Sequence, residues 1–294
     1  MKIWRSFLII GLVNISLLGL AQLTIANTDI KIEGDSPFTA QELNSGAIKV
    51  VVTYNPLNNN SESADPKNFF YQIYYQDQKK VEASDFTQFT GEVYLKDLDN
   101  NGVDEVVVRV FTGGAHCCTN TIIYTWQEPN FIKTETDLMD GSGGTFEDLN
   151  GDGKLEFLSY DNSFLYKFSS YAGSFPPTLI YSFQNGHFQT VTRKYPKKLR
   201  ETLQEMYKAI REGQKKNYEI NGILAGYVAQ KILLGEYEEG WQFMLANYDR
   251  ISDWGLVRYD SNGKVIDKYV DYPTALKAFL IEEKYLDQDG KPLF

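Results

Sequence analysis

The chain has 294 residues, of which 43% are hydrophobic and 14% aromatic, and its formal net charge is −10. This length and apolar content allow one large domain or two modest ones with a sizeable core. The acidic balance argues against nucleic acid as a partner, because phosphate binding needs clustered Lys and Arg, and it disfavours docking on anionic lipid.

The N-terminus carries a targeting pattern. Lys2 and Arg5 precede an apolar stretch that reaches Leu20, and small residues follow up to Ala26. We expect residues 1–26 to be a secretory signal peptide, because the apolar run is shorter than the ~20 residues that a membrane span requires. A membrane anchor is the alternative. The mature protein is then expected to be periplasmic or extracellular, with no integral membrane span.

The region after the signal is dominated by predicted strands. β-branched and aromatic runs predict strands at 50–54, 69–75, 91–96, 106–111, 122–126, 131–136, 157–160, 165–168, 179–183 and 188–192. Residues 39–43 are the one short helical candidate, 55–67 form a loop rich in Pro, Asn and Ser, and 77–82 are predicted to be a charged turn.

Helical periodicity begins after residue 195. Apolar side chains recur every three or four residues within 199–210, 220–234 and 236–248, and Pro273 starts a last helix through Leu286. Asp-Ser-Asn-Gly at 260–263 predicts a hairpin.

The predicted fold class is therefore α+β. Residues 27–195 are expected to form antiparallel β-sheet repeats, in a partial propeller-like or rolled sheet. Residues 196–294 are expected to form a small, mainly helical subdomain with one hairpin.

Two acidic loops, at residues 97–105 and 148–156, match position for position. The first is Asp-Leu-Asp-Asn-Asn-Gly-Val-Asp-Glu and the second is Asp-Leu-Asn-Gly-Asp-Gly-Lys-Leu-Glu. Oxygen side chains at alternate positions of a tight loop repel one another unless a cation lies between them, and calcium prefers such a set of oxygens. The expected ligands are the side chains of Asp97, Asp99, Asn101, Glu105, Asp148, Asn150, Asp152 and Glu156, with the backbone carbonyls of Val103 and Lys154.

Neither loop is an EF-hand. The twelfth position, which an EF-hand fills with glutamate, is Val108 in the first loop and Ser159 in the second, and strands follow both. We therefore expect two structural Ca²⁺ sites, each within a β-hairpin. The alternative is a polar Asp/Asn/Gly turn that holds no metal.

The two loops and the strands after them resemble the FG-GAP and VCBS-type repeats of secreted and cell-surface proteins. This resemblance implies calcium-loaded β-propeller blades that serve in adhesion or ligand display. It covers the β-rich part of the chain and leaves the helical part unassigned.

The only two cysteines, Cys117 and Cys118, are adjacent and follow His116. We expect them to pair with each other as a vicinal disulfide in an oxidising compartment. The alternatives are two separately used thiols, or a redox or soft-metal site that includes His116.

The common enzyme motifs of zinc proteases, serine hydrolases and phosphate-binding loops are absent from the sequence. We therefore expect a binding or structural module whose partner is a cell-surface glycan or a protein. Aromatic residues from Tyr71 to Tyr75 and Trp126 could contact such a partner if they are exposed, but packing in the core is the favoured interpretation of these rings. The alternative is a hydrolase or redox-active protein that uses His116 with the two cysteines, or paired carboxylates.

Overall fold

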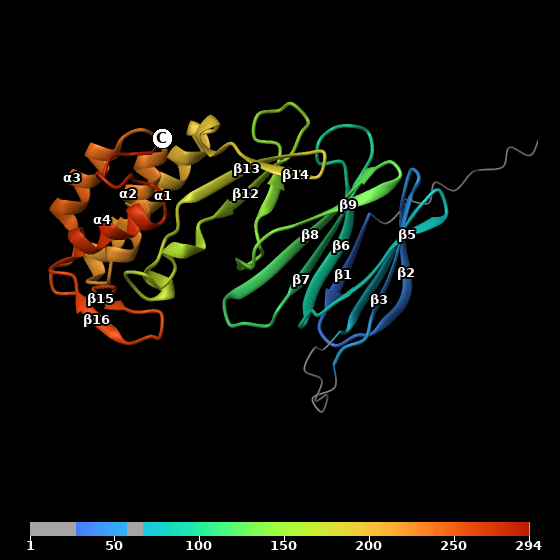
Figure 1. Ribbon diagram of the computed structural model, residues 1–294, viewed down its shortest axis with the longest axis horizontal. Coiled ribbons are helices and arrows are strands. Elements are labelled where there is room, and N and C mark those ends of the chain that lie inside the picture. Colours follow the sequence, from blue (N-terminus) through green and yellow to red (C-terminus); the bar gives the residue numbers. More distant parts are fainter. Residues whose placement is uncertain (1–27, 58–66, 294) are drawn as a thin grey trace, which may run out of the picture.

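The computed structural model describes residues 28–57 and 67–293. The expected signal peptide lies outside these residues, as does the middle of the 55–67 loop. The molecule is elongated, with the helices at one end, one sheet in the middle and two larger sheets at the other end (Figure 1).

Two antiparallel sheets form the strand-rich end of the molecule. The first is a meander of β2 (Phe38–Ser45), β3 (Ile48–Tyr54), β4 (Phe69–Tyr75) and β5 (Gln78–Asp85). The second has six strands, β1 (Asp29–Glu33), β6 (Thr90–Lys96), β7 (Glu105–Phe111), β8 (Cys117–Gln127), β9 (Asn130–Glu135) and β10 (Met139–Asp140). In this six-stranded sheet the order is β1-β6-β7-β8-β10, and β9 also pairs with β8.

The main β core lies between these two sheets. Residues of β3 alternate between buried and half-buried, as expected for a strand with one face on a core. Val50 and Val52 of β3 belong to the same buried cluster as Val106 and Val108 of β7. The middle of β7 is buried on both faces, because a third sheet packs on the opposite side.

The third sheet contains β11 (Thr145–Glu147), β12 (Glu156–Tyr160), β13 (Thr178–Gln184) and β14 (His187–Thr190). A small cluster of fully buried side chains joins it to the six-stranded sheet: Leu98, Val107, Ile123 and Phe183. We call this cluster the junction core. It places the two acidic loops next to each other.

The helical end contains α1 (Pro196–Lys216), α2 (Asn221–Leu233), α3 (Tyr237–Asn247) and α4 (Tyr272–Glu282). Every residue of α2 is buried, so α2 is the central element of this part. The short hairpin of β15 (Val257–Tyr259) and β16 (Val265–Lys268) lies beside these helices (Figure 1). Two 3₁₀ turns, η1 (Asn162–Phe164) and η2 (Tyr171–Gly173), lie in the connection from β12 to β13 and contact α2. A third, η3 (Thr192–Lys194), leads from β14 into α1.

The α+β class, with antiparallel sheets followed by a helical region, is confirmed. The propeller-like arrangement is not confirmed, because the sheets that carry the two loops differ in strand number and in what they pack against. No helix of the described residues is long and apolar enough to cross a membrane.

Three local predictions were wrong. Residues 39–43 belong to β2 and not to a helix, since Leu43 packs into the β core. Residues 77–82 mostly form the edge strand β5, whose exposed face carries the charged side chains. Residues 165–168 form no strand, because Phe168 is buried among the helices.

Candidate metal centre

The first acidic loop joins β6 to β7, and its first aspartate holds it in a tight turn. The two carboxylate oxygens of Asp97 accept the backbone N–H groups of Asn101 at 3.1 Å and Gly102 at 2.8 Å. Gly102 has a φ of 87°, a left-handed conformation that glycine adopts without steric cost. Glu105 closes the loop, because its carboxylate accepts the N–H of Leu98 at 2.9 Å.

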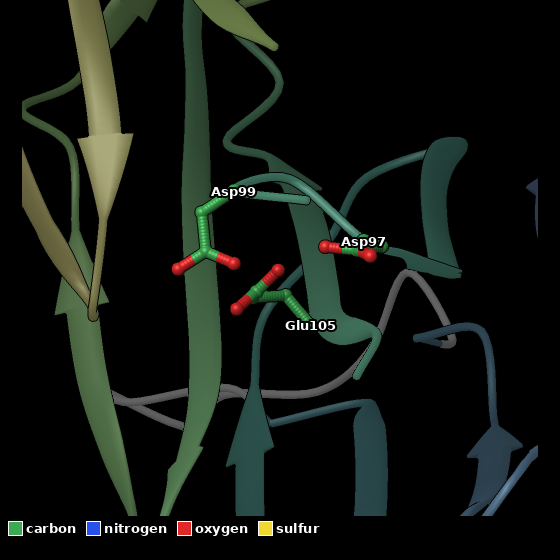
Figure 2. A group of neighbouring side chains, drawn as sticks. All are labelled: Asp97, Asp99 and Glu105. Carbon is green, nitrogen blue, oxygen red and sulfur yellow. The ribbon is translucent and has the colours of Figure 1, made fainter. Parts of the chain in front are cut away.

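Three carboxylates converge inside this turn (Figure 2). One oxygen from each of Asp97, Asp99 and Glu105 lies within 4.8 Å of the other two. Asp99 is 7% exposed and Glu105 is 1% exposed, so water screens these charges poorly. Burial raises the pKa of Glu105 to about 7, and the charges of Asp99 and Asp97 add to this effect. The repulsion between these carboxylates is reduced either by protonation or by a bound cation.

The two carboxylate oxygens of Asp99 have different surroundings. Oδ2 accepts the backbone N–H of Asn185 at 3.1 Å, and Asn185 lies in the turn between β13 and β14 of the third sheet. Oδ1 is buried and has no hydrogen-bond partner. A buried carboxylate oxygen without a partner carries a desolvation cost, which a bound cation would offset.

The other two expected ligands of the first loop are exposed. The side-chain oxygen of Asn101 accepts the N–H of Val103 at 2.8 Å, which is a local turn interaction. Val103 itself is 37% exposed. Asn101 and the Val103 carbonyl therefore stay predicted ligands, beside the three carboxylates that the structure brings together.

The second loop has the same spacing, but backbone groups satisfy its first aspartate. Asp148 accepts the N–H groups of Gly151 at 2.6 Å, Gly153 at 3.0 Å and Asn150 at 3.3 Å. These hydrogen bonds, that from Gly153 most strongly, hold the pKa of Asp148 below its usual value. Asp148 thus acts as the turn-closing residue of this loop.

The remaining side chains of the second loop also bond to one another. The amide of Asn150 donates to Asp152 at 3.0 Å, and the other oxygen of Asp152 accepts the N–H of Lys154 at 2.9 Å. Glu156 repeats the role of its counterpart and accepts the N–H of Leu149 at 3.1 Å. Within residues 28–57 and 67–293, the first loop alone holds three His, Cys, Asp or Glu ligand atoms close enough to share an ion.

The two loops contact each other directly across the junction core. The N–H of Leu155 donates to the carbonyl of Leu98 at 2.9 Å, and the side-chain amide of Asn100 donates to the carbonyl of Asp152 at 3.4 Å. Sequence reasoning missed Asn185 as part of this site. Its Asn-Gly dipeptide is a hairpin-turn signal, but nothing in the sequence shows that this turn meets Asp99.

Residues 116–118, which include both cysteines, contact the η2 turn in the connection between β12 and β13. Cys117 and Cys118 are paired with each other at the start of β8, which leaves no free thiolate for a soft metal. His116 stacks on Tyr171 of η2, with ring centroids 4.0 Å apart and an interplanar angle of 13°. The hydroxyl of Tyr171 donates to Asp140 at 2.5 Å.

The aromatic residues considered as partner contacts are largely used inside the fold. Tyr71 is buried in the β core, where its hydroxyl donates to Asp85 at 2.9 Å and lies 3.0 Å from that of Tyr124. Tyr75 stacks on Trp126, with ring centroids 3.8 Å apart. These rings therefore stabilise the sandwich rather than form an open surface.

Comparison with known proteins relates the helical part of the chain to one family. A family model described as "sll0997 C-terminal domain" matches residues 189–284, which contain the four α-helices found in the described part of the chain. "Probable thylakoid lumen protein sll0997" of Synechocystis sp. is 42% identical over 203 residues, which are 66% of this chain and 60% of that protein. "Uncharacterized protein y4bJ" of Sinorhizobium fredii is 33% identical over 207 residues, 66% of this chain and 32% of that protein.

The chain thus spans less than two thirds of the length of either relative. No solved structure matches. These findings overturn the resemblance to FG-GAP and VCBS-type repeats, since the matching family model is the sll0997 C-terminal domain and neither relative is named as such a repeat protein. The misleading signal was a short acidic spacing, which any tight Asp/Asn/Gly turn can acquire because these residues favour turns.

Proposed function

We propose that this protein is a calcium-binding structural and binding module outside the cytoplasm, in which one Ca²⁺ fastens the six-stranded sheet to the third sheet. The observation that supports it is the placement of Asp99. Asp99 contributes an oxygen to the three-carboxylate cluster. Its Oδ1 is buried without a hydrogen-bond partner, while its Oδ2 accepts the N–H of Asn185 in the third sheet. An ion bound to Asp99 would therefore stabilise that contact as well.

The choice of calcium follows from the donor atoms. The cluster offers oxygens only, and all three side chains, Asp97, Asp99 and Glu105, are acids. Soft and borderline metals favour nitrogen or sulfur donors, whereas calcium favours oxygens and tolerates irregular geometry. Magnesium demands near-ideal octahedral geometry, which carboxylates held by a turn and a strand end are less suited to give. The second loop stays a predicted calcium site, with its oxygens now used in local hydrogen bonds.

The proposed location has support from the sequence and from a relative. Lys2, Arg5 and the apolar stretch after them form a secretory signal pattern. The related Synechocystis protein carries the name of a thylakoid lumen protein. A pair of bonded cysteines also suits an oxidising compartment.

Calorimetric calcium titration tests the site, with a matched pair of variants. Glu105→Gln removes one charge of the cluster but keeps an oxygen for the N–H of Leu98. We expect it to weaken calcium binding about tenfold or more, because one of three ligand charges is lost. Asp104→Asn changes the net charge equally and lies outside the cluster. Equal affinity of the two variants would disprove the site.

Hydrogen exchange of the turn at Asn185 tests the fastening role. Calcium should slow amide exchange at Asn185 in the unmodified protein and in Asp104→Asn, but not in Glu105→Gln. Calcium binding without such protection would leave the site in place and remove its role at the junction. The calorimetric titration also gives the number of bound calcium ions. A second binding event that Asp148→Ala abolishes would establish the second loop as a site.

A further inference from the structure

A cavity of about 340 Å³ lies between β12 of the third sheet and the η1–η2 segment. Tyr160 at the end of β12 and Tyr171 of η2 line it, together with Asp140 from β10. Figure 1 shows the segment after β12 running toward the helical end, so the cavity lies where the sheets meet the helices. Its volume is within the usual range for small-molecule sites, about 300–1,000 Å³.

The lining combines aromatic rings with neutral and acidic hydrogen-bonding groups. Tyr160 is 47% exposed, so part of its ring is open to a ligand in the cavity. Asp140, Asn162 and Ser159 supply a carboxylate, an amide and a hydroxyl. No Lys, Arg or His is among the described residues that line the cavity.

Ser159 provides a separate sign that a polar ligand belongs here. It is 2% exposed, and its hydroxyl has no hydrogen-bond partner. A buried hydroxyl without a partner costs free energy, so such groups are rare in folded proteins.

The tyrosines of the cavity wall are held in place before any ligand arrives. The ring of Tyr171 is fixed by its stack on His116 and by its hydrogen bond to Asp140. Next to it Tyr166 has a φ of 61°, a strained conformation for a bulky residue. Its N–H donates to Ser174 at 3.1 Å, and Trp254 donates to its carbonyl at 2.9 Å.

We propose that this cavity binds a neutral saccharide. A sugar ring has a face of C–H bonds that packs on aromatic rings, and hydroxyls around its edge that require partners. Tyr160 and Tyr171 offer the rings, and Asp140, Asn162 and Ser159 offer the partners. This site is independent of the calcium site and does not rest on the proposed function.

The lining argues against ligands of other chemistry. An anionic ligand would place its charge beside Asp140 with no cationic side chain in the wall to offset it. An organic cation would suit Asp140 and the rings, but it would offer no hydrogen-bond partner to the amide of Asn162. A neutral ligand rich in hydroxyls can bond to both Asp140 and Asn162.

Ligand-observed NMR by saturation transfer tests the proposal with glucose, maltose, cellobiose and N-acetylglucosamine as probes. We expect at least one of them to receive saturation, most strongly at the ring C–H protons that face the tyrosines. Tetramethylammonium serves as the cationic probe. Saturation of tetramethylammonium alone, or of none of the four sugars, would overturn the proposal.

Three variants locate the binding. Tyr160→Ala removes an exposed ring, and Asp140→Asn keeps an acceptor for Tyr171 while it removes the charge. Each should weaken binding of the responding sugar about tenfold, the usual cost of a lost charged hydrogen bond or a lost stacking ring. Tyr259→Ala, at a 60% exposed ring of β15, is the control. Binding that all three variants leave unchanged would place the sugar elsewhere and disprove the assignment.

Discussion

The substitution Asp99→Asn should have opposite effects on stability in the absence and in the presence of calcium. Asparagine keeps an oxygen that can accept the N–H of Asn185, so the contact to the third sheet is retained. It removes one negative charge from a cluster whose oxygens lie within 4.8 Å of one another. Its amide can also donate to the carboxylate of Glu105. Without calcium, the variant should therefore be more stable than the unmodified protein.

The expected magnitudes follow from the geometry. Two unit charges about 4–5 Å apart repel by about 3–4 kcal/mol at an effective dielectric constant of about 20. The raised pKa of Glu105 means that protonation already relieves part of this repulsion near neutral pH. We therefore expect Asp99→Asn to raise the free energy of unfolding by about 1 kcal/mol in EDTA. With calcium at 100 times its dissociation constant, the unmodified protein gains about 2.7 kcal/mol, and the variant loses most of this gain.

Urea unfolding in EDTA and in saturating calcium measures both effects, with Asp104→Asn as the control of equal net charge. The stability order of Asp99→Asn and the unmodified protein should reverse between the two conditions, and the control should show no reversal. If Asp99→Asn were equally destabilising with and without calcium, Asp99 would be a structural acceptor only. The reasoning about a shared ion would then be refuted.

Three further predictions concern packing and local hydrogen bonds. Leu98→Ala in the junction core should lower the free energy of unfolding by about 2–5 kcal/mol, because it opens a cavity among fully buried side chains. Urea titrations measure this loss, and a value below about 1 kcal/mol would contradict the packing role. Asp148→Ala should lower the free energy of unfolding by about 1 kcal/mol, equally in EDTA and in magnesium, because it removes backbone bonds such as that from Gly153. A larger loss in magnesium than in EDTA would contradict this purely local role. Tyr71→Phe should lower the free energy of unfolding by about 1–2 kcal/mol, because Asp85 loses its buried hydrogen-bond donor. Thermal unfolding measures this loss, and an unchanged midpoint would show that water replaces the hydroxyl.

The elements predicted best from the sequence are those whose burial follows one simple period. The alternation in β3 and the three-to-four spacing in α1 follow directly from a single buried face. β5 was missed because its charged side chains are tolerated on an edge strand, where pairing with β4 decides the structure. Residues 165–168 were misassigned because an aromatic run does not show whether a sheet or a helix will cover it.

The candidate site was predicted in part. The spacing of the first loop identified Asp97, Asp99 and Glu105, which the structure brings together. It also proposed Asn101, whose side chain is used in a local turn. The contact with Asn185 could not be predicted, because it joins residues far apart in sequence through the packing of two sheets.

The difference between the two loops follows from what packs against each of them. The first loop faces the third sheet, whose β13–β14 turn binds one oxygen of Asp99 and leaves the other buried among acids. The second loop instead meets Tyr195, the residue just before α1. Tyr195 hydrogen-bonds to Glu156, so that burial and this carboxylate raise the pKa of Tyr195 well above its usual value. A phenol can satisfy a buried carboxylate without any ion, whereas three converging carboxylates cannot satisfy one another. The spacing of acidic residues thus makes a metal site possible, and the neighbouring element decides whether the carboxylates stay in need of a cation.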